Sequence, residues 1–409
     1  MKILLLNHYA GSSEMGMEFR PFYLAREWVR MGHEVRIVAA DYSHLRRVNP
    51  TIEKDFQKTE IDGIEYRWIK TGRYHGNGIK RAVTMFQFVG KLMLNASKIA
   101  KEWKPDVVIA SSTYPMDTFA AQRIRRKAHA RYIHEVHDLW PATLYEVGGM
   151  SRKNPFVVLM QISENSAYKH CDKVVSLMPY AKDYMMEHGL KEDKFVNIQN
   201  GVVEEEWESY DRIPPEHEEL LSELKDKFVV GYFGGHALSN ALDLMLDIAK
   251  KETDPDIAFV LVGDGVEKPQ LMERKEKENI QNVYFLPPVK KTAVPDLIRY
   301  FDCSYMGGIP SPLYRFGLCL NKMYDSMMGG KPVICAMTAP RTLVEEYDCG
   351  YKVDPSNIQD ILDAIEKLKA MPKEERDRLG ENGKKAIEEK FTYRKLAEQF
   401  VQVMKENKE

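Results

Sequence analysis

The chain has 409 residues, more than one ordinary hydrophobic core accommodates, which predicts two domains. Its 59 basic and 61 acidic residues leave a net charge of −2, so no overall positive field favours nucleic-acid binding. Hydrophobic residues make up 44% of the chain, as in globular proteins. The five cysteines are scattered, with no pair at the two-residue spacing of a metal or redox motif, which favours reduced structural thiols.

The first half of the chain alternates short apolar runs with helical patterns such as Phe19–Met31 and Asp117–Ala128. The first apolar run ends at Asn7, too early for the hydrophobic region of an export signal. Buried strands separated by helices form parallel sheets covered on both faces, so residues 1–203 are predicted to form one doubly wound α/β domain. The predicted strands are Ile3–Leu6, Val35–Ala39, Val107–Ala110, Tyr132–Val136, Val174–Leu177 and Val196–Ile198.

The same alternation restarts in the second half, after an acidic segment that contains a proline pair. This segment, residues 204–225, is predicted to be a linker. Residues 226–390 are predicted to form a second doubly wound domain, and the pattern then stays helical to the end of the chain. The predicted elements are strands Phe228–Phe233, Ala258–Val262, Val283–Leu286, Cys303–Met306 and Pro332–Cys335, and helices Ile358–Ala370, Lys373–Lys390 and Tyr393–Lys405.

The stretch from Arg315 to Ile334 reads as a loop, a short helix and a buried strand. Loop amides and a helix N-terminus attract anions, and Lys322 adds a full positive charge there. Asp325 lies one helical turn later on the same face. These residues favour a pocket in which a cation binds phosphate and a carboxylate binds sugar hydroxyls or ribose. The alternative is an ordinary surface pair on an amphipathic helix.

The predicted strand Tyr132–Val136 is followed by His137 and Asp138, which should emerge at its carboxyl end. Ligands of doubly wound domains bind at these strand ends. A histidine beside an aspartate can bind a sugar hydroxyl or exchange a proton near neutral pH. Strand alternation places Glu135 on the same face as His137. The alternative is a histidine that packs at a strand end without contacting a ligand.

Other strand ends carry weaker signals. The loop after the first strand contains Gly16 and leads to Glu18 and Arg20, but it lacks the glycine turn of a dinucleotide site and suits a wall over a larger ligand. In the second half, Gly234-Gly-His-Ala-Leu-Ser-Asn240 and Val262-Gly-Asp-Gly265 are turns that allow a ligand to approach the backbone. Turns of this kind are common in all proteins.

The segment 73–104 contains seven basic residues and one acidic residue among aromatic and aliphatic side chains. This composition is typical of a helix that binds a membrane surface. A helix that packs on the core and carries a basic outer side has the same composition. The sequence leaves both interpretations open.

Taken together, these loops resemble glycosyltransferase family 4, the retaining nucleotide-sugar transferases of the GT-B fold, over nearly the whole chain. The family motifs are Gly32-His-Glu-Val35, His137-Asp138, Gln199-Asn-Gly-Val202, Val262-Gly-Asp-Gly265 and Gly330-Lys-Pro-Val-Ile334. Tyr9-Ala-Gly, Gly16-Met-Glu-Phe-Arg-Pro21, Asn77-Gly78 and Asp138-Leu-Trp-Pro141 are similar to the branch that builds bacterial O-antigen and capsule repeats with N-acetylfucosamine-type sugars.

The resemblance implies two Rossmann-like domains facing each other across a cleft, with the C-terminal helix of residues 391–409 packed back on the first. Three residues are expected to act in the reaction: Lys322 on the donor diphosphate, Asp325 on the ribose and His137 on the transferred sugar. Donor contacts are expected from Gly16, Gly235, His236, Asn240, Gly263, Asp264, Gly265, Pro288, Val289, Arg315, Gly317, Leu318 and Asn321, and acceptor-side contacts from Glu18, Arg20 and Asp138.

The chain departs from the family pattern in the paired-acid motif. The first acid is absent, because Gly317 stands eight residues before Asp325. Tyr314 and Arg315 are the candidates for its replacement.

A second departure concerns the Arg/Lys pair that the family carries after the first strand of the second domain. His236 and Asn240 replace it here. More of the diphosphate binding is therefore expected from Lys322 and Arg315.

The activity implied by the resemblance is retaining transfer of an N-acetylated deoxyhexose or hexosamine from a nucleotide diphosphate, with UDP the first expectation. The acceptor would be a saccharide or a lipid-linked sugar in bacterial O-antigen, capsule or lipopolysaccharide biosynthesis. No metal, no other cofactor and no nucleic-acid partner is expected. The chain is expected in the cytoplasm or at the inner face of the plasma membrane. The alternatives are a nucleotide-sugar epimerase of the same fold and a non-catalytic sugar-nucleotide-binding subunit.

Overall fold

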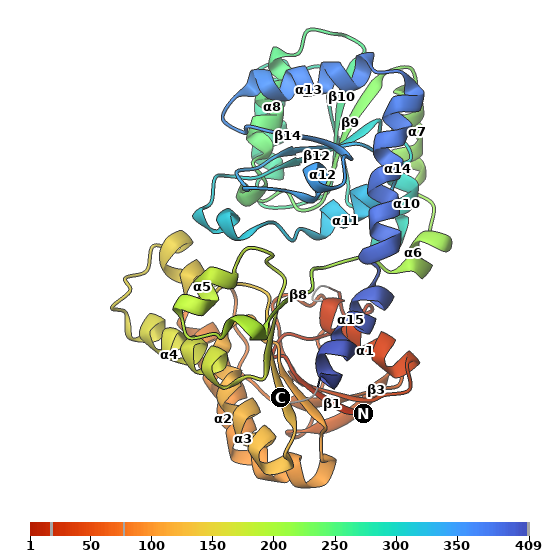
Figure 1. The fold of residues 1–409 in the computed structure, drawn as a ribbon. Helices are drawn as coiled ribbons and strands as arrows, with labels where there is room; N and C mark the ends of the chain where they lie inside the picture. The colour runs from red at the N-terminus through yellow and green to blue at the C-terminus, as the bar shows by residue number, and fades with distance from the viewer. Residues whose placement is uncertain (17–18, 77, 407–409) are drawn as a thin grey trace. The chain divides into compact units, whose positions relative to one another are not determined.

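The computed structural model describes residues 1–16, 19–76 and 78–406. The chain forms two compact units, Met1–Gln199 with Tyr393–Glu409 and Asn200–Thr392 (Figure 1). Each unit is built on its own largely parallel sheet. The predicted class, two Rossmann-like α/β domains, is confirmed.

The first unit contains, within the described residues, an eight-stranded sheet in the order β3-β4-β2-β1-β5-β6-β7-β8. All neighbours pair in parallel except β3 and β4, which form an antiparallel pair at one edge. The strands are β1 Lys2–Leu6, β2 Glu34–Ala40, β3 Gln57–Ile61, β4 Ile64–Ile69, β5 Val107–Ala110, β6 Arg131–Val136, β7 Lys173–Ser176 and β8 Phe195–Asn197.

The helices of the first unit include one from the far end of the chain. The bounds are α1 Phe19–Arg30, α2 Ile79–Trp103, α3 Thr118–Ala128, α4 Pro155–His170, α5 Lys182–Glu187 and α15 Tyr393–Lys405. Helix α15 packs beside α1 (Figure 1), where Trp28 Nε1 donates to Ala397 O and the Trp28 and Phe400 rings lie 5.2 Å apart. The last helix therefore completes the core of the first unit.

The second unit contains, in the part of the chain described, a six-stranded parallel sheet in the order β11-β10-β9-β12-β13-β14. Alternate residues of β9 enter different clusters. Val230 packs with α8 (Leu242–Lys251) and α13 (Ile358–Ala370), and Val229 packs with α7 (Pro215–Glu223) and α10 (Val294–Ile298). Both faces of the sheet are thus buried, which explains its continuous apolar strands. The strands are β9 Phe228–Phe233, β10 Ile257–Val262, β11 Val283–Leu286, β12 Cys303–Gly307, β13 Val333–Ala336 and β14 Gly350–Val353.

The segment 204–225, predicted to be a linker, lies within the second unit. It contains two helices, and its Ile213 is buried with its N–H donating to Asp296 Oδ2 at 3.0 Å. The proline pair begins a packed helix here and does not mark a free connection. The helices of the unit are α6 Glu204–Glu208, α7 Pro215–Glu223, α8 Leu242–Lys251, α9 Lys268–Lys277, α10 Val294–Ile298, α11 Asn321–Met328, α12 Leu343–Glu346, α13 Ile358–Ala370 and α14 Lys373–Lys390.

Three strands have no counterpart in the sequence prediction: β3, β4 and β14. All lie in the outer part of their sheets, and the residues of β14 and most of those of β3 are only partly buried. Strands in such positions need no continuous apolar run. Their sequences therefore lack the signal that identified the central strands.

Candidate functional site

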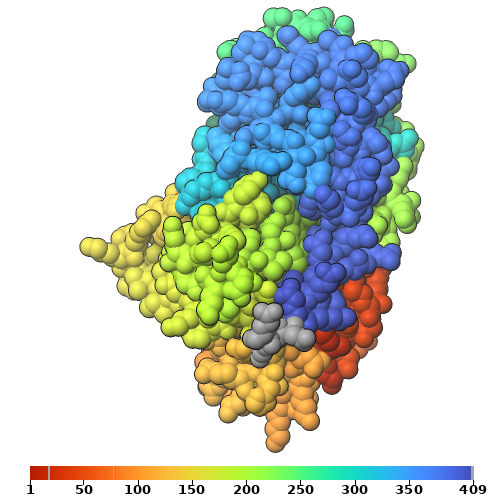
Figure 2. Space-filling model, viewed as in Figure 1, coloured from red at the N-terminus to blue at the C-terminus, as the bar shows by residue number. Residues whose placement is uncertain are grey.

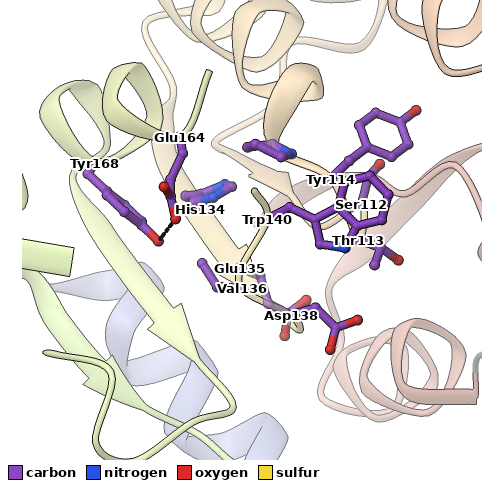
Figure 3. A pocket seen from close by; sticks show the side chains of 11 residues that line it. Ser112, Thr113, Tyr114, His134, Glu135, Val136, Asp138, Trp140, Glu164 and Tyr168 are labelled. Atoms are coloured by element: carbon purple, nitrogen blue, oxygen red, sulfur yellow. Dashed lines mark hydrogen bonds between the residues drawn. The ribbon is translucent and has the colours of Figure 1, made fainter. Parts of the chain in front are cut away.

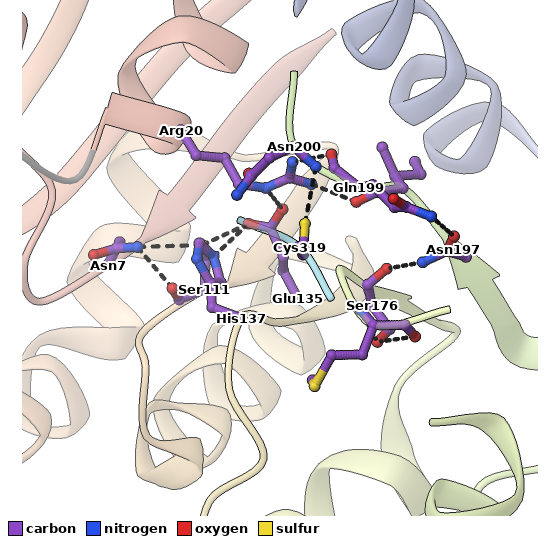
Figure 4. A network of polar contacts seen from close by, with 12 residues as sticks. Asn7, Arg20, Ser111, Glu135, His137, Ser176, Asn197, Gln199, Asn200 and Cys319 are labelled. Carbon is purple, nitrogen blue, oxygen red and sulfur yellow. Dashed lines mark hydrogen bonds and ion pairs between the residues drawn. The ribbon is translucent and has the colours of Figure 1, made fainter. Parts of the chain in front are cut away.

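Strand ends bring polar side chains together at the carboxyl edge of the first sheet (Figure 4). The register pairs Leu6 of β1 with Ala110 of β5, so the residues that follow them, Asn7 and Ser111, are neighbours. Asn7 Nδ2 donates to Ser111 O at 2.6 Å, and the Ser111 hydroxyl donates to Glu135 Oε2 at 2.6 Å. Asn7 and Ser111 directly follow predicted strands but were not among the predicted site residues.

His137 joins this network. Its Nε2 lies 3.0 Å from Ser111 Oγ and 3.2 Å from Glu135 Oε2. The Glu135 side chain is fully buried and that of His137 is 13% exposed. The prediction that Glu135 and His137 share one face is confirmed. His137 is therefore a partly exposed histidine at a strand end, and its ring contacts the buried carboxylate of Glu135.

Arg20 binds the other oxygen of that carboxylate. Its Nε donates to Glu135 Oε1 at 2.9 Å, and its terminal nitrogens donate to the carbonyl oxygens of Ile198, at 3.0 Å, and Gln199. Burial alone raises the pKa of Glu135, but Arg20, His137 and a hydrogen bond from Ser111 outweigh it and hold this pKa well below its ordinary range. Glu135 is thus a buried carboxylate anion. Arg20 is 5% exposed, which does not support the expected direct contact with an acceptor.

The remaining residues predicted in the first unit have different surroundings. Gly16 has φ 73°, a conformation that favours glycine, and a Cβ there would lie 3.2 Å from the Arg47 side chain. Asp138 is exposed directly after β6. Glu18 lies outside the described residues.

A small pocket lies beside the network, between β6 and α4 (Figure 3). Its lining includes His134, Trp140, Glu164 and Tyr168, and the Tyr168 hydroxyl donates to Glu164 Oε1 at 3.0 Å. Burial raises the pKa of Glu164 to about 8 and lowers that of His134 to about 4, so both side chains are neutral at pH 7. This pocket was not predicted, because a single acid within a helix gives no local signal in the sequence.

In the second unit, Lys322 near the start of α11 reaches the end of β9. Its Nζ donates to Tyr232 OH at 3.0 Å and to Asn240 Oδ1 at 2.7 Å, and it lies 4.6 Å from the centre of the Tyr232 ring. Burial lowers the pKa of Lys322 to about 8. Among the described residues no carboxylate forms an ion pair with this amine, so it can accept an anionic ligand without breaking a salt bridge.

Asp325 and Lys322 have different partners. Lys291 Nζ forms a hydrogen bond and ion pair with Asp325 Oδ1, and the Asp325 side chain is only 7% exposed. The interpretation of Lys322 and Asp325 as a surface pair is therefore wrong, because each has its own partners. Lys291 was missed, since nothing in its local sequence links it to a residue that lies 34 positions later.

The turns after β9 and β10 pack backbone against backbone. A Cβ on Gly263 would lie 1.9 Å from Gly234 O, and one on Gly265 would lie 2.3 Å from His236 O. Glycine is thus required at both positions. The two predicted turns are brought together, and Asp264 is exposed beside them.

His236 was expected to contact the donor in place of a family cation, but the structure buries it completely. Burial, reinforced by Lys268 and Lys322, lowers its pKa to about 4. A neutral imidazole cannot supply positive charge to a diphosphate. Asn240 contributes by binding Lys322 and by donating to Gly235 O at 2.8 Å.

The loop before α11 explains why the first acid of the motif is missing. Gly317 has φ 98°, in the region that favours glycine, so a side chain there would strain the backbone. Arg315 is exposed, and its guanidinium lies 4.1 Å from the Phe316 ring centre and donates to Pro312 O. Of the remaining predicted donor contacts, Leu318 is buried, Val289 is partly buried, and Pro288 and Asn321 are exposed.

The described residues contain no group of three or more His, Cys, Asp or Glu side chains arranged to hold a metal ion. In the same part of the chain, every helix is too short or too polar to cross a membrane.

Family models match both halves of the chain. Residues 16–206 match the model "Glycosyltransferase Family 4", and residues 216–386 match the model "Glycosyl transferases group 1". The two matches follow each other with a short gap and cover most of the sequence.

One similar protein is the glycosyl transferase WcaI of Escherichia coli (strain K12), named for colanic acid biosynthesis. It is 20% identical over 212 residues, which are 50% of this chain and 51% of WcaI, so the match spans about half of that protein.

Solved structures match over the full length. Anabaena Alr3699/HepE in complex with UDP and glucose aligns with a TM-score of 0.66 and 15% identity, covering 99% of each chain. Sucrose-phosphate synthase from Thermosynechococcus elongatus aligns with a TM-score of 0.72 and 15% identity, covering 98% of each chain. At these identities the likeness shows a shared fold, which is GT-B.

Proposed function

We propose that this chain, which belongs to the glycosyltransferases of the GT-B fold and family 4, transfers a sugar from a nucleotide diphosphate to a saccharide or lipid-linked acceptor. The acceptor would belong to bacterial surface polysaccharide synthesis, such as O-antigen, capsule or lipopolysaccharide. The transferred sugar would be an N-acetylated deoxyhexose or hexosamine. The name of WcaI supports a role in polysaccharide synthesis.

The observation that carries this proposal is the environment of Lys322. Within the described residues, this largely buried amine is bound to neutral oxygens of Tyr232 and Asn240 and to no carboxylate, which makes it a site prepared for an anion. It lies at the carboxyl end of β9, beside the turns at Gly234 and Gly263, where a doubly wound domain binds its ligand. A nucleoside diphosphate fits this arrangement, and the UDP in HepE supports UDP as the carrier.

The proposed reaction proceeds with retention and without a covalent enzyme intermediate. The acceptor hydroxyl attacks the face that the diphosphate leaves, and a phosphate oxygen takes its proton. Lys322 and loop N–H groups stabilise the charge that develops on the departing diphosphate. Because protein groups fill this role, we expect transfer to be undiminished in excess EDTA. Loss of transfer that magnesium restores would overturn this part of the proposal.

A nucleotide-sugar panel tests the function directly. Purified protein is incubated with each donor and a bacterial lipid extract, and release of nucleoside diphosphate is measured. We expect release that depends on both one donor and the extract. Release without acceptor would indicate an epimerase, and donor binding without any release would indicate a non-catalytic subunit.

We also propose that α2 carries a membrane-surface face. Its buried side packs on the unit, but four other apolar residues of the helix are exposed and recur at helical spacing. They are Ile79 (85% exposed), Val83 (46%), Phe86 (48%) and Leu94 (83%). A helix that only covers the core has no use for this second apolar stripe.

Basic residues adjoin the stripe. The Phe86 ring lies 6.4 Å from that of Phe156 at the start of α4, next to the exposed Arg152 and Lys153. In the space-filling view the yellow segment before α4 protrudes from the surface (Figure 2). An apolar stripe beside basic residues fits an anionic bilayer.

Sedimentation with anionic liposomes tests this face. Val83→Glu and Phe86→Glu are expected to abolish binding that the wild type shows at low salt. Gln402→Glu, at an exposed position of α15, adds the same charge away from this helix and is expected to retain most of the binding. Equal loss in all three variants would argue for general electrostatics alone.

A further inference from the structure

The pocket between β6 and α4 lies at the edge of the first sheet where a doubly wound domain binds its ligands. Part of its wall, Ser112 to Pro115, follows the end of β5, and another part, His134 to Val136, ends β6. Figure 3 shows Glu164 and Tyr168 of α4 on the other side of the pocket from Ser112. The space inside holds one water-sized group. A ligand can therefore insert a single small group here.

Glu164 is the unusual residue of this wall, because it is a buried acid with neutral partners. Tyr168 OH donates to its Oε1 at 3.0 Å, and Tyr184 OH and Gln161 Nε2 donate to its Oε2 at 3.1 and 2.8 Å. Buried acids are normally paired with a cation, but none of the described wall residues is a lysine or an arginine. A buried acid that no ion pair explains, at a ligand-binding edge, indicates a function.

The hydrogen-bonding groups of the wall determine which ligand group fits. The Tyr168 oxygen, which donates to Glu164, can still accept a hydrogen bond. Glu164 and His134 are both neutral at pH 7, so the acid carries one donor, and the imidazole carries one donor and one acceptor. The anionic wall residue Glu135 is already paired with Arg20 and would repel a second anion. A hydroxyl or an amide, which can both donate and accept without carrying charge, fits these surroundings best.

Trp140 lines the same pocket and is partly exposed. An indole ring has a flat apolar face, on which the C–H groups of a sugar ring can pack. We propose that this pocket is an acceptor subsite: it binds one hydroxyl or amide of the saccharide acceptor while the sugar ring packs on Trp140. This inference rests on the proposed sugar transfer. It assigns acceptor contacts to Trp140, Tyr168, Glu164 and His134, which were not among the predicted site residues.

Steady-state kinetics test the subsite in the full chain. Release of nucleoside diphosphate is measured at saturating donor against the concentration of the bacterial lipid extract. Tyr168→Phe and Trp140→Leu should each raise the KM for the extract about 5- to 10-fold, while the dissociation constant for UDP stays unchanged. Glu164→Gln keeps an uncharged group of the same shape and should keep a KM close to that of the wild type. Tyr132→Phe, which removes a buried hydroxyl that contacts Thr118 outside the pocket, is the matched control and should leave the KM unchanged.

Direct binding separates the subsite from the transfer reaction. Saturation-transfer NMR is recorded with a panel of neutral methyl glycosides and with glucose 6-phosphate as an anionic probe. We expect a signal from at least one neutral glycoside, and a weaker signal from it in Tyr168→Phe and Trp140→Leu but not in Tyr132→Phe.

Three results would overturn the subsite: no signal from any neutral glycoside, equal signals in the wild type and Tyr168→Phe, or a stronger signal from the anionic probe. Equal signals would mean that the pocket holds a water molecule only. If the glycosides bind as expected but no nucleotide sugar is turned over, the sugar transfer is refuted while the subsite stands. If transfer proceeds and the pocket variants keep the wild-type KM, the subsite is refuted while the transfer stands.

Discussion

At Lys322, burial among neutral partners brings the pKa close to physiological pH. The free amine is charged below about pH 8 and neutral above it, so affinity for UDP should weaken as pH rises through 8. The dissociation constant, measured by calorimetry from pH 6.5 to 9.5, should increase with a slope approaching one decade per pH unit. Lys322→Met should bind UDP weakly, and its dissociation constant should not increase in this pH range. If the increase near pH 8 persists in this variant, another group is responsible for it.

The same residue should control the reaction rate. Lys322→Met is expected to reduce kcat by at least about 10²-fold, the typical loss when one electrostatic contact to a developing anion is removed. Arg123→Met, at an exposed position of α3, provides the control for loss of a cation elsewhere. A rate close to that of the wild type would place the diphosphate at another position.

Lys291 and Asp325 form a second residue-scale pair. Lys291→Met leaves a buried carboxylate without its partner, which should lower the free energy of unfolding by about 1–3 kcal/mol in urea. Lys290→Met, an exposed neighbour, should change it little. Lys291→Met/Asp325→Asn should recover most of the loss, since no unpaired charge remains, and failure to recover would mean that the pair is not the cause.

At the scale of elements, the donor turns depend on close approach of two backbones. Gly263→Ala puts a methyl group 1.9 Å from Gly234 O at φ 152°, and should destabilise the second unit by about 2–4 kcal/mol and abolish nucleotide binding. A Cβ on Gly235 meets nothing within 4 Å, so Gly235→Ala should fold normally. Thermal unfolding and UDP binding of the two variants check this. Equal stability would show that the turns separate easily.

The elements also show where sequence patterns are reliable. Central strands such as β1 and β9 are buried along nearly their whole length, so their apolar runs were recognisable. The partly exposed β3 and β14 left no such run. In α2, the apolar sequence pattern could not distinguish the core-facing side from the exposed apolar stripe, because burial depends on what packs against each side.

For the whole molecule, the first unit is discontinuous in sequence and needs α15 to complete its core. Phe400→Ala should lower the stability of that unit by about 3–5 kcal/mol, because it leaves a cavity beside Trp28. Gln402→Ala, two residues further along α15 and exposed, is the control. Calorimetry and Trp fluorescence should show a shifted first-unit transition, and a shift only in the second unit would contradict this assignment.

The sequence by itself determined the two α/β domains, the strand end that carries His137 and the helix start that carries Lys322, and its motifs supported the resemblance to a family. These follow from periodicity and from short motifs, which are local properties. Only the tertiary structure decided that Arg20 is buried against Glu135, that Lys291 pairs with Asp325, that His236 is neutral, and that 204–225 is packed. The reason is physical: charge state and partner choice depend on burial and on contacts between distant segments, and those exist only once the chain has folded.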